Sequence, residues 1–230
     1  MARFARIVVP GVAHHVTQRG NRRQRIFEGE QDYALYRDLL AARCQDCGVE
    51  VWSYCLMPNH VHLILVPSTE EGLSRAVGET HRRYTAFVNA RARVTGHLFQ
   101  SRFGSVAMDE AHLLAAIRYV ALNPVKAELV TRADAWPWAS TRALLAGQDD
   151  GLVRVGPVLD RIDNVAGFLA LPADHETEQR LLNAQGIGRP LMDDQALAAL
   201  ETRLGRLVRR QRRGPKRSAD SGPGQGNLGI

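Results

Sequence analysis

Two histidines, His60 and His62, stand one residue apart directly after the turn-forming segment Met57-Pro58-Asn59. They open an apolar run that ends at Val66 and is typical of a buried β-strand. Because successive side chains of a strand point to opposite faces, both imidazoles would lie on one face and could reach a single cation. Imidazole alone does not select the metal, but Mg²⁺ or Mn²⁺ is compatible if oxygen ligands complete the coordination shell. The alternative is a pair of hydrogen-bonded strand histidines, which a bare His-x-His motif taken alone favours.

A second pair of residues, Tyr119 and Asn123, is four positions apart in the segment 118–127. In a helix this spacing places both side chains on one face, where the tyrosine could act as a nucleophile and the amide oxygen as a third metal ligand. A phenol has an ordinary pKa of about 10, so such a nucleophile needs a cation or a base nearby. The alternative for Tyr119 is a core aromatic, although Ile117 and Val120 are the better core candidates.

Two further pairs of potential ligands carry weaker signals. His14 and His15 are adjacent, so on a strand they face opposite ways; at most one could approach the metal, and we expect both to be structural. Cys44 and Cys47 form a Cys-x-x-Cys motif without a second pair at zinc spacing, and we expect them to pack within a helix, with Cys44 the more buried. The chain has 3 Cys, and an odd number argues against a disulfide framework and for a reducing cytoplasm.

Arginine is concentrated in two parts of the chain. Six arginines precede the first acidic residue, Glu28, and a second cluster runs from Arg203 to Arg217. Together with a formal net charge of +6, this pattern indicates a polyanionic partner, and the planar guanidinium suits phosphates and base edges. An ordinary solvated surface is the alternative. No apolar run approaches the roughly 18 residues of a membrane helix, so no membrane partner is expected.

The elements that must position these residues can be read from the spacing of the apolar side chains. That spacing predicts strands over 12–19, 49–56, 60–66 and 104–108, and helices over 31–47, 71–93 and 109–122. The last helix is expected to stop at Asn123-Pro124, because proline disfavours a helical conformation in the residue before it. The order favours an α+β fold with a ferredoxin-like or RRM-like antiparallel sheet and helices packed on one face.

The composition changes near Gly147-Gln148-Asp149-Asp150-Gly151, where we place a boundary. Residues 1–147 would form the catalytic domain, and residues 148–217 a basic helical extension with helices over 159–171, 176–185 and 197–208. From residue 218 to 230 Ser, Gly, Pro and Gln dominate, which predicts a disordered tail.

Five segments, taken in order, resemble the REP-associated tyrosine transposases of the single-tyrosine HUH transposase superfamily: "HHVTQRGNRRQ", "YCLMPNHVHLIL", "LFQSRFGS", "IRYVALNPVKAELV" and "WPWAS". HUH stands for histidine, hydrophobe, histidine, which is His60-Val61-His62 in this sequence. The resemblance covers roughly residues 12–141 and continues at Gly188-Arg189-Pro190-Leu191. It implies the HUH endonuclease fold for the predicted α+β domain.

The resemblance also implies a chemistry. His60 and His62 would be metal ligands, Tyr119 the nucleophile and Asn123 a further ligand to a divalent metal such as Mg²⁺ or Mn²⁺. Attack of the tyrosine on a DNA phosphate would give a 5′-phosphotyrosine and a free 3′-OH. The substrate would be single-stranded DNA bearing a hairpin, handled by a monomer or a homodimer in the cytoplasm, in association with the nucleoid.

The expected DNA contacts fall in three groups. One follows the first strand and matches the family's "RGN" turn, a second lies in "FQSRF", where ordinary loop polarity is the alternative, and the third lies in the extension. Phosphate contacts from the third group would position DNA without reading its sequence. The residues are Arg19, Asn21, Arg22, Arg23, Gln100, Arg102, Arg189, Arg209, Arg210, Arg212 and Arg213.

Two other functions fit parts of the pattern. A metal hydrolase with His-x-His at a strand start typically uses a (β/α)₈ barrel, which this order of elements does not suit. A noncatalytic nucleic-acid-binding protein on a ferredoxin-like sheet would stack bases on strand aromatics, for which Trp52 and Tyr54 are the candidates. A metal-dependent nicking assay separates the three, since a hydrolase leaves no covalent protein–DNA product and a binder leaves the DNA whole.

Overall fold

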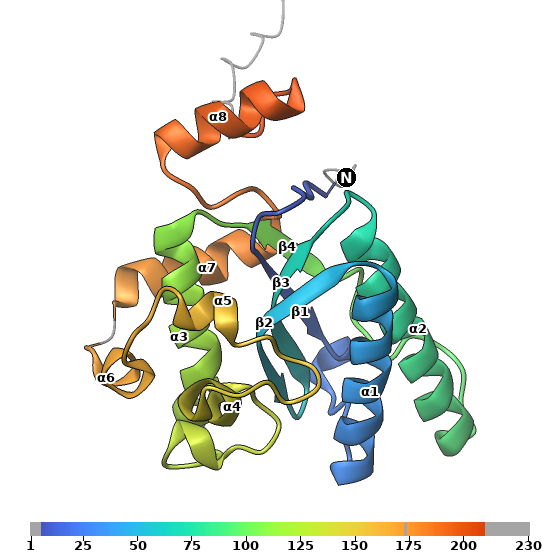
Figure 1. Cartoon of the computed structure of the whole chain (residues 1–230). Helices are drawn as coiled ribbons and strands as arrows, with labels where there is room; N and C mark the ends of the chain where they lie inside the picture. Colours follow the sequence, from blue (N-terminus) through green and yellow to red (C-terminus); the bar gives the residue numbers. More distant parts are fainter. Residues whose placement is uncertain (1–5, 173, 210–230) are drawn as a thin grey trace, which may run out of the picture.

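A four-stranded antiparallel sheet forms the centre of the molecule (Figure 1). The computed structural model describes residues 6–172 and 174–209. The strand order is β2-β3-β1-β4. The strands are β1 (His14–Arg19), β2 (Val49–Met57), β3 (His60–Pro67) and β4 (Gly104–Ala107). The fold class expected from the sequence is confirmed, and the strand bounds agree with the expected ones to within two residues.

The register of the sheet decides which side chains share a face with the histidine pair. β2 and β3 form a hairpin in which Met57 pairs with His60 across a two-residue turn. On the other side of β3, β1 pairs Thr17 with His62 and Arg19 with His60. Paired residues of neighbouring strands project to the same face, so Thr17 and Arg19 lie beside the imidazoles.

Helices cover both faces of the sheet. α1 (Glu30–Asp46) and α2 (Gly72–Ala92) form the layer on one face, and α3 (Glu110–Lys126) with α7 (His175–Ile187) lies across the other (Figure 1). The sequence predicted helices on one face only. The second layer is needed because the histidine face also carries apolar side chains such as Ile64 and Val106, which are 0% and 1% exposed.

The α1–α2 layer is held by buried polar contacts as well as by apolar packing. The Asp32 carboxylate, 1% exposed, accepts hydrogen bonds from the Arg91 guanidinium and from the Glu28 N–H. The hydroxyl of Tyr36 lies 2.9 Å from His81 Nε2. Cys44 is buried and Cys47 is half-buried at the end of α1, which confirms the packing role expected for this pair.

α3 does not stop at Asn123-Pro124, and the prediction that it would is wrong. Pro124 lies inside the helix, which ends at Lys126. A proline removes one hydrogen bond to the preceding turn, but the last turn continues, because Ala127 N–H donates to the Asn123 carbonyl and Leu129 N–H to the Pro124 carbonyl. Asn123 therefore stays helical, on the same face as Tyr119.

The region after residue 147 packs against the sheet domain. Leu152, Val158, Ile162 and Leu181 belong to the same apolar core as β2 and β3. A second, smaller cluster joins the N-terminal residues Ile7 and Val9 to Leu200 and Val208. The single helix expected over 159–171 is wrong, since one short helix ends at Leu159 and another spans only 165–170. Asn164 begins the second by accepting a hydrogen bond from Gly167 N–H. The remaining elements are η1 (Asn21–Arg23), η2 (Ala133–Ala135), α4 (Thr141–Ala146), α5 (Gly156–Leu159), α6 (Val165–Ala170) and α8 (Asp194–Leu204).

The division at residue 147 stays a prediction, and the expected tail over 218–230 lies outside the described residues. Within the described ranges, no helix is long and apolar enough to cross a membrane.

Candidate active site

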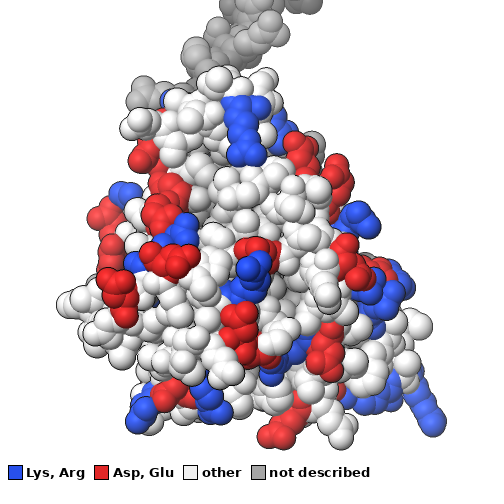
Figure 2. All heavy atoms as spheres, in the orientation of Figure 1, with Lys and Arg blue, Asp and Glu red and all other residues white. Residues whose placement is uncertain are grey.

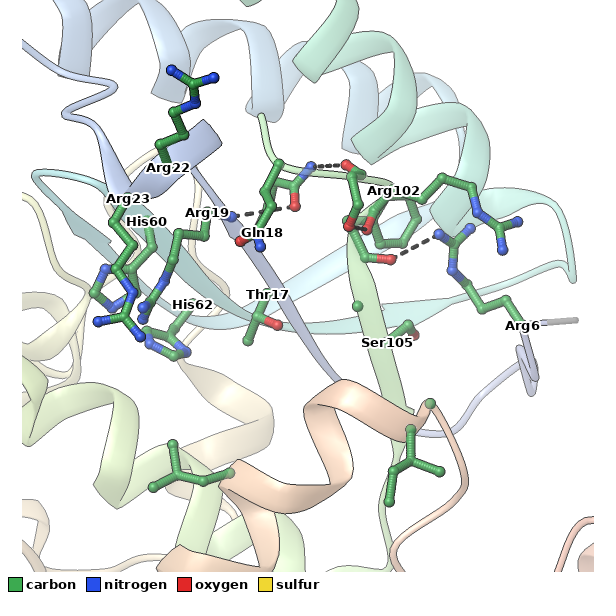
Figure 3. A pocket seen from close by; sticks show the side chains of 17 residues that line it. Arg6, Thr17, Gln18, Arg19, Arg22, Arg23, His60, His62, Arg102 and Ser105 are labelled. Atoms are coloured by element: carbon green, nitrogen blue, oxygen red, sulfur yellow. Dashed lines mark hydrogen bonds between the residues drawn. The ribbon is translucent and has the colours of Figure 1, made fainter. Parts of the chain in front are cut away.

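A cavity of about 820 Å³ opens on the histidine face of the sheet, where β1 and β3 meet the turn η1 (Figure 3). His60 and His62 line it together with Thr17 and Arg19 of β1. The segment 100–105 forms another wall, and α7 contributes Leu182 and Ile187. The cavity therefore gathers segments from both halves of the chain.

Both histidines of the motif present a free ring nitrogen. His60 Nδ1 lies 2.6 Å from the Asn59 side-chain oxygen, which can only accept, so Nδ1 carries the proton and Nε2 keeps its lone pair. His62 Nδ1 lies 3.0 Å from His15 Nε2, and His62 Nε2 is buried with no hydrogen-bond partner among the described residues. When His62 donates its Nδ1–H to His15 Nε2, its Nε2 lone pair is available to a metal ion.

Burial also keeps these imidazoles neutral. Desolvation, followed by the charge of Arg19, lowers the pKa of His60 to about 4. Desolvation likewise lowers the pKa of His62 well below its ordinary value, and His15, His60 and Arg19 act in the same direction. Neutral rings with available lone pairs are what metal coordination requires.

His15 belongs to this site, although the sequence predicted a purely structural role for it. Its ring stacks on His62 with centroids 5.2 Å apart, and it is 1% exposed. The pairing of β1 with β3 brings His15 opposite Ile64, next to His62 on the same face. His14 faces the other way and bonds to Val9 N–H and the Val12 carbonyl.

Tyr119 of α3 lies directly across from the histidines. Its ring centroid is 5.3 Å from that of His62 and 6.2 Å from that of His15, both edge to face. Burial raises the pKa of Tyr119, while a hydrogen bond with Asn123 and the charge of Arg19 oppose that rise. The structure thus brings together the proposed nucleophile, the two imidazoles and the amide on one side of the sheet.

An ion pair between α3 and α7 lies beside the tyrosine. Lys126 Nζ lies 5.3 Å from the centroid of the Tyr119 ring and forms an ion pair with Glu178 of α7. Glu178 is also 3.8 Å from Arg118, and its negative charge raises the pKa of Tyr119. Sequence reasoning missed Lys126 and Glu178, because nothing local indicates that α7 packs on α3.

The donor set around the histidines limits which metal fits. In the described ranges, no three side chains of His, Cys, Asp or Glu come together as a metal cluster. A cation on His60 and His62 would therefore need oxygen from the Asn123 amide, from water or from a phosphate. Such a mixed nitrogen and oxygen shell, left open on one side, suits Mn²⁺ or Mg²⁺ acting on a phosphodiester.

Arginines without acidic partners surround the cavity. Arg6, Arg19, Arg22, Arg23 and Arg102 line it, and no carboxylate of the described residues forms an ion pair with any of them. In Figure 3, Arg19 and Arg23 approach the histidines, whereas Arg22 points away from them. By contrast, acidic and basic side chains alternate on the face shown in Figure 2. Positive charge is thus concentrated at the cavity, where a polyanion would be attracted.

The turn that carries these arginines has an unusual backbone. Arg22 and Arg23 have φ values of 52° and 62°, a left-handed conformation that costs free energy outside glycine. At Gly20 a Cβ atom would lie 2.3 Å from the Gln24 carbonyl oxygen, so only glycine fits. Consecutive strained residues at a cavity rim are typical of functional turns.

The other expected DNA contacts divide into three groups. Gln100 lines the cavity, whereas Asn21 lies beside it in η1, with its N–H bonded to the Leu98 carbonyl. Arg189 donates to the Val208 carbonyl, and Arg209 pairs with Glu201, so neither side chain lines the cavity. Three residues, Arg210, Arg212 and Arg213, lie outside the described residues.

The sequence matches the family described as "Transposase IS200 like" over residues 8–123, half of the chain. The chain belongs to the IS200-like transposase family. Its members process DNA, so the coarse function expected from the motifs is confirmed for this transposase.

Two solved structures are similar to this transposase. A REP-associated tyrosine transposase bound to a REP hairpin is 21% identical, with a TM-score of 0.56 over 67% of this chain and 92% of that one. A putative transposase from Deinococcus radiodurans R1 is 23% identical, with a TM-score of 0.37 over 53% of this chain and 97% of that one. The first match establishes a shared fold. No curated protein matches this sequence.

Proposed function

We propose that this transposase cuts and rejoins single-stranded DNA through a covalent bond to Tyr119. The observation that carries the proposal is the packing of Tyr119 against His62, which lines the arginine-rich cavity. Among the described residues, His62 Nε2 has no hydrogen-bond partner, and the cavity arginines have no acidic partner. A nucleophile, nitrogen ligands for a divalent cation and an anion-binding wall are three parts that metal-assisted phosphoryl transfer uses.

The proposed roles are metal binding, phosphate orientation and nucleophilic attack. His60 and His62, with the Asn123 amide oxygen, would hold a divalent cation, either Mg²⁺ or Mn²⁺, which when bound withdraws charge from the phosphate. Arg19 and Arg23 orient the phosphodiester in the cavity. The Tyr119 oxygen attacks phosphorus and loses its proton to water, while the bond from phosphorus to the 3′ oxygen breaks and that oxygen takes a proton from water. The products are a 5′-phosphotyrosine and a free 3′-OH, and attack by a second 3′-OH reverses the step.

The substrate we propose is hairpin-forming single-stranded DNA. The support is the shared fold of the REP-associated transposase, whose structure was solved with a REP hairpin. The turn residues Arg19, Asn21, Arg22 and Arg23 and the loop residues Gln100 and Arg102 would contact it at the cavity. Arg189, Arg209 and the arginines beyond would act on phosphates further away. The protein would work as a monomer or a homodimer on the nucleoid, in the cytoplasm.

The two other functions are disfavoured by specific contacts. A four-stranded antiparallel sheet is not the core of a (β/α)₈ hydrolase. A base-stacking platform is also absent at the candidate aromatics: Tyr54 is 1% exposed and donates its hydroxyl to Asp150, and the Arg161 guanidinium lies 4.9 Å from the centroid of the Trp52 ring.

The test is to trap the covalent product. A single-stranded hairpin oligonucleotide labelled at its 3′ end is incubated with protein and Mn²⁺, and labelled protein is detected on a denaturing gel. Tyr119→Phe should abolish the adduct while leaving DNA binding intact. Tyr33→Phe, which removes a phenol oxygen on the opposite face of the sheet, is the control and should keep the adduct. An adduct that persists in Tyr119→Phe would refute the assignment.

A further inference from the structure

A second cavity, of about 590 Å³, adjoins the first at the edge of the sheet. One wall is α2, with Gly78 and His81, and the other is the segment 97–103. Arg6, Gln18 and Arg102 line both cavities. Thr17 and Arg19 point toward the histidines, whereas Gln18, between them on β1, points toward α1 and α2. The two cavities therefore lie on opposite faces of the sheet and connect around the end of β1.

The floor of the second cavity is aromatic. The rings of His81 and Phe99 have centroids 4.4 Å apart, and Phe103 lies 6.3 Å from His81. Each of the three residues is 7% exposed, so the rings are held by the core and show only part of their surface to the cavity. Burial lowers the pKa of His81 to about 3, so its ring is neutral. The exposed edges of these rings and the side chain of Leu98 form an uncharged, apolar floor against which a flat base can pack.

Two arginines that repel each other stand where the cavities meet. The Arg6 guanidinium lies 3.6 Å from the centroid of the Phe103 ring and donates to the Phe103 carbonyl. Desolvation and the nearby charge of Arg102 lower the pKa of Arg6 to about 10. Figure 3 shows the two guanidinium groups side by side. Neither has a carboxylate partner among the described residues, so an anion is the missing neighbour.

We propose that this cavity takes one unpaired nucleobase of the DNA strand, with an adjoining phosphate bound between Arg6 and Arg102. The inference rests on the proposed function, because it assumes that a single strand crosses the histidine cavity. A nucleotide of single-stranded DNA fits both parts of the site, because its phosphate can bind Arg6 and Arg102 and its base can pack on the apolar floor. Bases of a duplex are already paired and stacked, so the site selects single-stranded positions.

Gly78 offers a way to fill the cavity without touching the cations or the catalytic groups. No heavy atom lies within 4 Å of the position that a Cβ would take at Gly78, so the space beside it is open. Alanine and phenylalanine both suit a helix better than glycine does. Gly78→Phe should occupy the cavity, and Gly78→Ala is the matched control, which changes the helix in the same way but leaves the space open.

The measurement is the binding of the full-length protein to two fluorescent 12-mers by anisotropy. One is oligo(dT), and the other is an abasic strand with the same number of phosphates. Packing of one base against aromatic side chains is worth up to about 5- to 150-fold in affinity. Gly78→Phe should therefore weaken oligo(dT) binding at least about fivefold relative to Gly78→Ala and change abasic binding less than about twofold. Arg102→Gln should weaken both strands to a similar extent.

Equal oligo(dT) affinities for Gly78→Phe and Gly78→Ala, or an equal loss on the abasic strand, would overturn the proposal. If Gly78→Phe melts well below Gly78→Ala, Thr85→Phe, two turns along α2 in the same cavity, replaces it. The Tyr119 adduct assay on the same proteins separates the two proposals. A selective loss of oligo(dT) binding without any adduct would support the base site and refute the tyrosine chemistry. Adduct formation together with equal oligo(dT) binding by Gly78→Phe and Gly78→Ala would support the tyrosine chemistry and refute the base site.

Discussion

The ion pair between Lys126 and Glu178 predicts how the reactivity of Tyr119 depends on pH. Glu178 comes from α7, and its charge raises the pKa of Tyr119, in addition to the larger effect of burial. Lys126 Nζ lies 5.3 Å from the phenol ring, where its positive charge would stabilise a phenolate if Glu178 did not neutralise it. Glu178→Gln removes the acid, preserves the shape of the side chain and leaves the cation in place.

The size of the effect follows from Coulomb's law. The charge removed is that of Glu178, which contacts Lys126 Nζ and so lies about as far from the phenol as that nitrogen, 5.3 Å from the ring centroid. Two unit charges at that separation interact by about 3 kcal/mol at an effective dielectric constant of 20 and by about 0.8 kcal/mol in water. The Lys126 side chain is 37% exposed, so solvent screening places the value near the lower end, at about 1.4 kcal/mol. That energy corresponds to one pH unit. Because the change favours the phenolate, Glu178→Gln should move the midpoint of the pH–rate profile down by about one unit.

The assay is the initial rate of adduct formation between pH 6 and pH 10 at saturating DNA and Mn²⁺. Because the pKa of Tyr119 is raised above its ordinary value of about 10, this range lies below the midpoint, and Glu178→Gln should react up to about tenfold faster than wild type across it. The control is Glu176→Gln on the same helix, whose side chain is 77% exposed and pairs with Arg180. The reasoning is refuted if the profile of Glu178→Gln coincides with that of Glu176→Gln, or moves to higher pH.

Two further predictions concern the metal site and the stability of the fold. His15→Ala leaves His62 Nδ1 without its partner at 3.0 Å and should weaken Mn²⁺ binding about 10- to 100-fold by calorimetry, whereas the exposed His97→Ala should not; equal affinities would rule out a positioning role. Asp32→Asn loses the charge-assisted bonds from Arg91 and should cost about 2 kcal/mol of unfolding free energy in urea at pH 7. Burial alone would raise the pKa of Asp32, but Arg91 and the Glu28 N–H lower it below 3.8, so this contribution is present above about pH 4 and is lost as the pH falls through the folded-state value. A gap between Asp32→Asn and wild type that stayed constant down to pH 2 would contradict that reading.

Local patterns were sufficient to predict the hairpin and the histidine pair. The turn at Pro58-Asn59 and the apolar run after it set the two strands, and strand alternation alone puts His60 and His62 on one face. The four-residue spacing of Tyr119 and Asn123 likewise placed both on one side of a helix, although the stop expected at Pro124 would have removed Asn123 from it. The proline rule failed there because packing and the last-turn hydrogen bonds outweigh a local preference of the backbone.

Contacts between distant segments could not be predicted in the same way. His15 is a neighbour of His62 only because β1 pairs with β3 in one particular register, and a shift by one residue would have turned His14 toward the site instead. Glu178 reaches Tyr119 because α7 packs on α3, and the sequence carries no spacing rule that joins positions 119 and 178. The second cavity depends on a similar meeting of α2 with the segment 97–103.

The residues that set the charge around Tyr119 lie outside the segment that matches the family. The family match ends at residue 123 and includes the two histidines, Tyr119 and Asn123, so it covers the groups proposed to make and break bonds. Lys126 and Glu178, which set the charge around the phenol, lie beyond it, as do the α7 side chains that wall the cavity. A charge placed on α7 changes the pKa of Tyr119 without altering the phenol itself or a proposed metal ligand. The part of the chain outside the family match can therefore adjust the rate of the proposed reaction, whose proposed bond-making groups lie within the match.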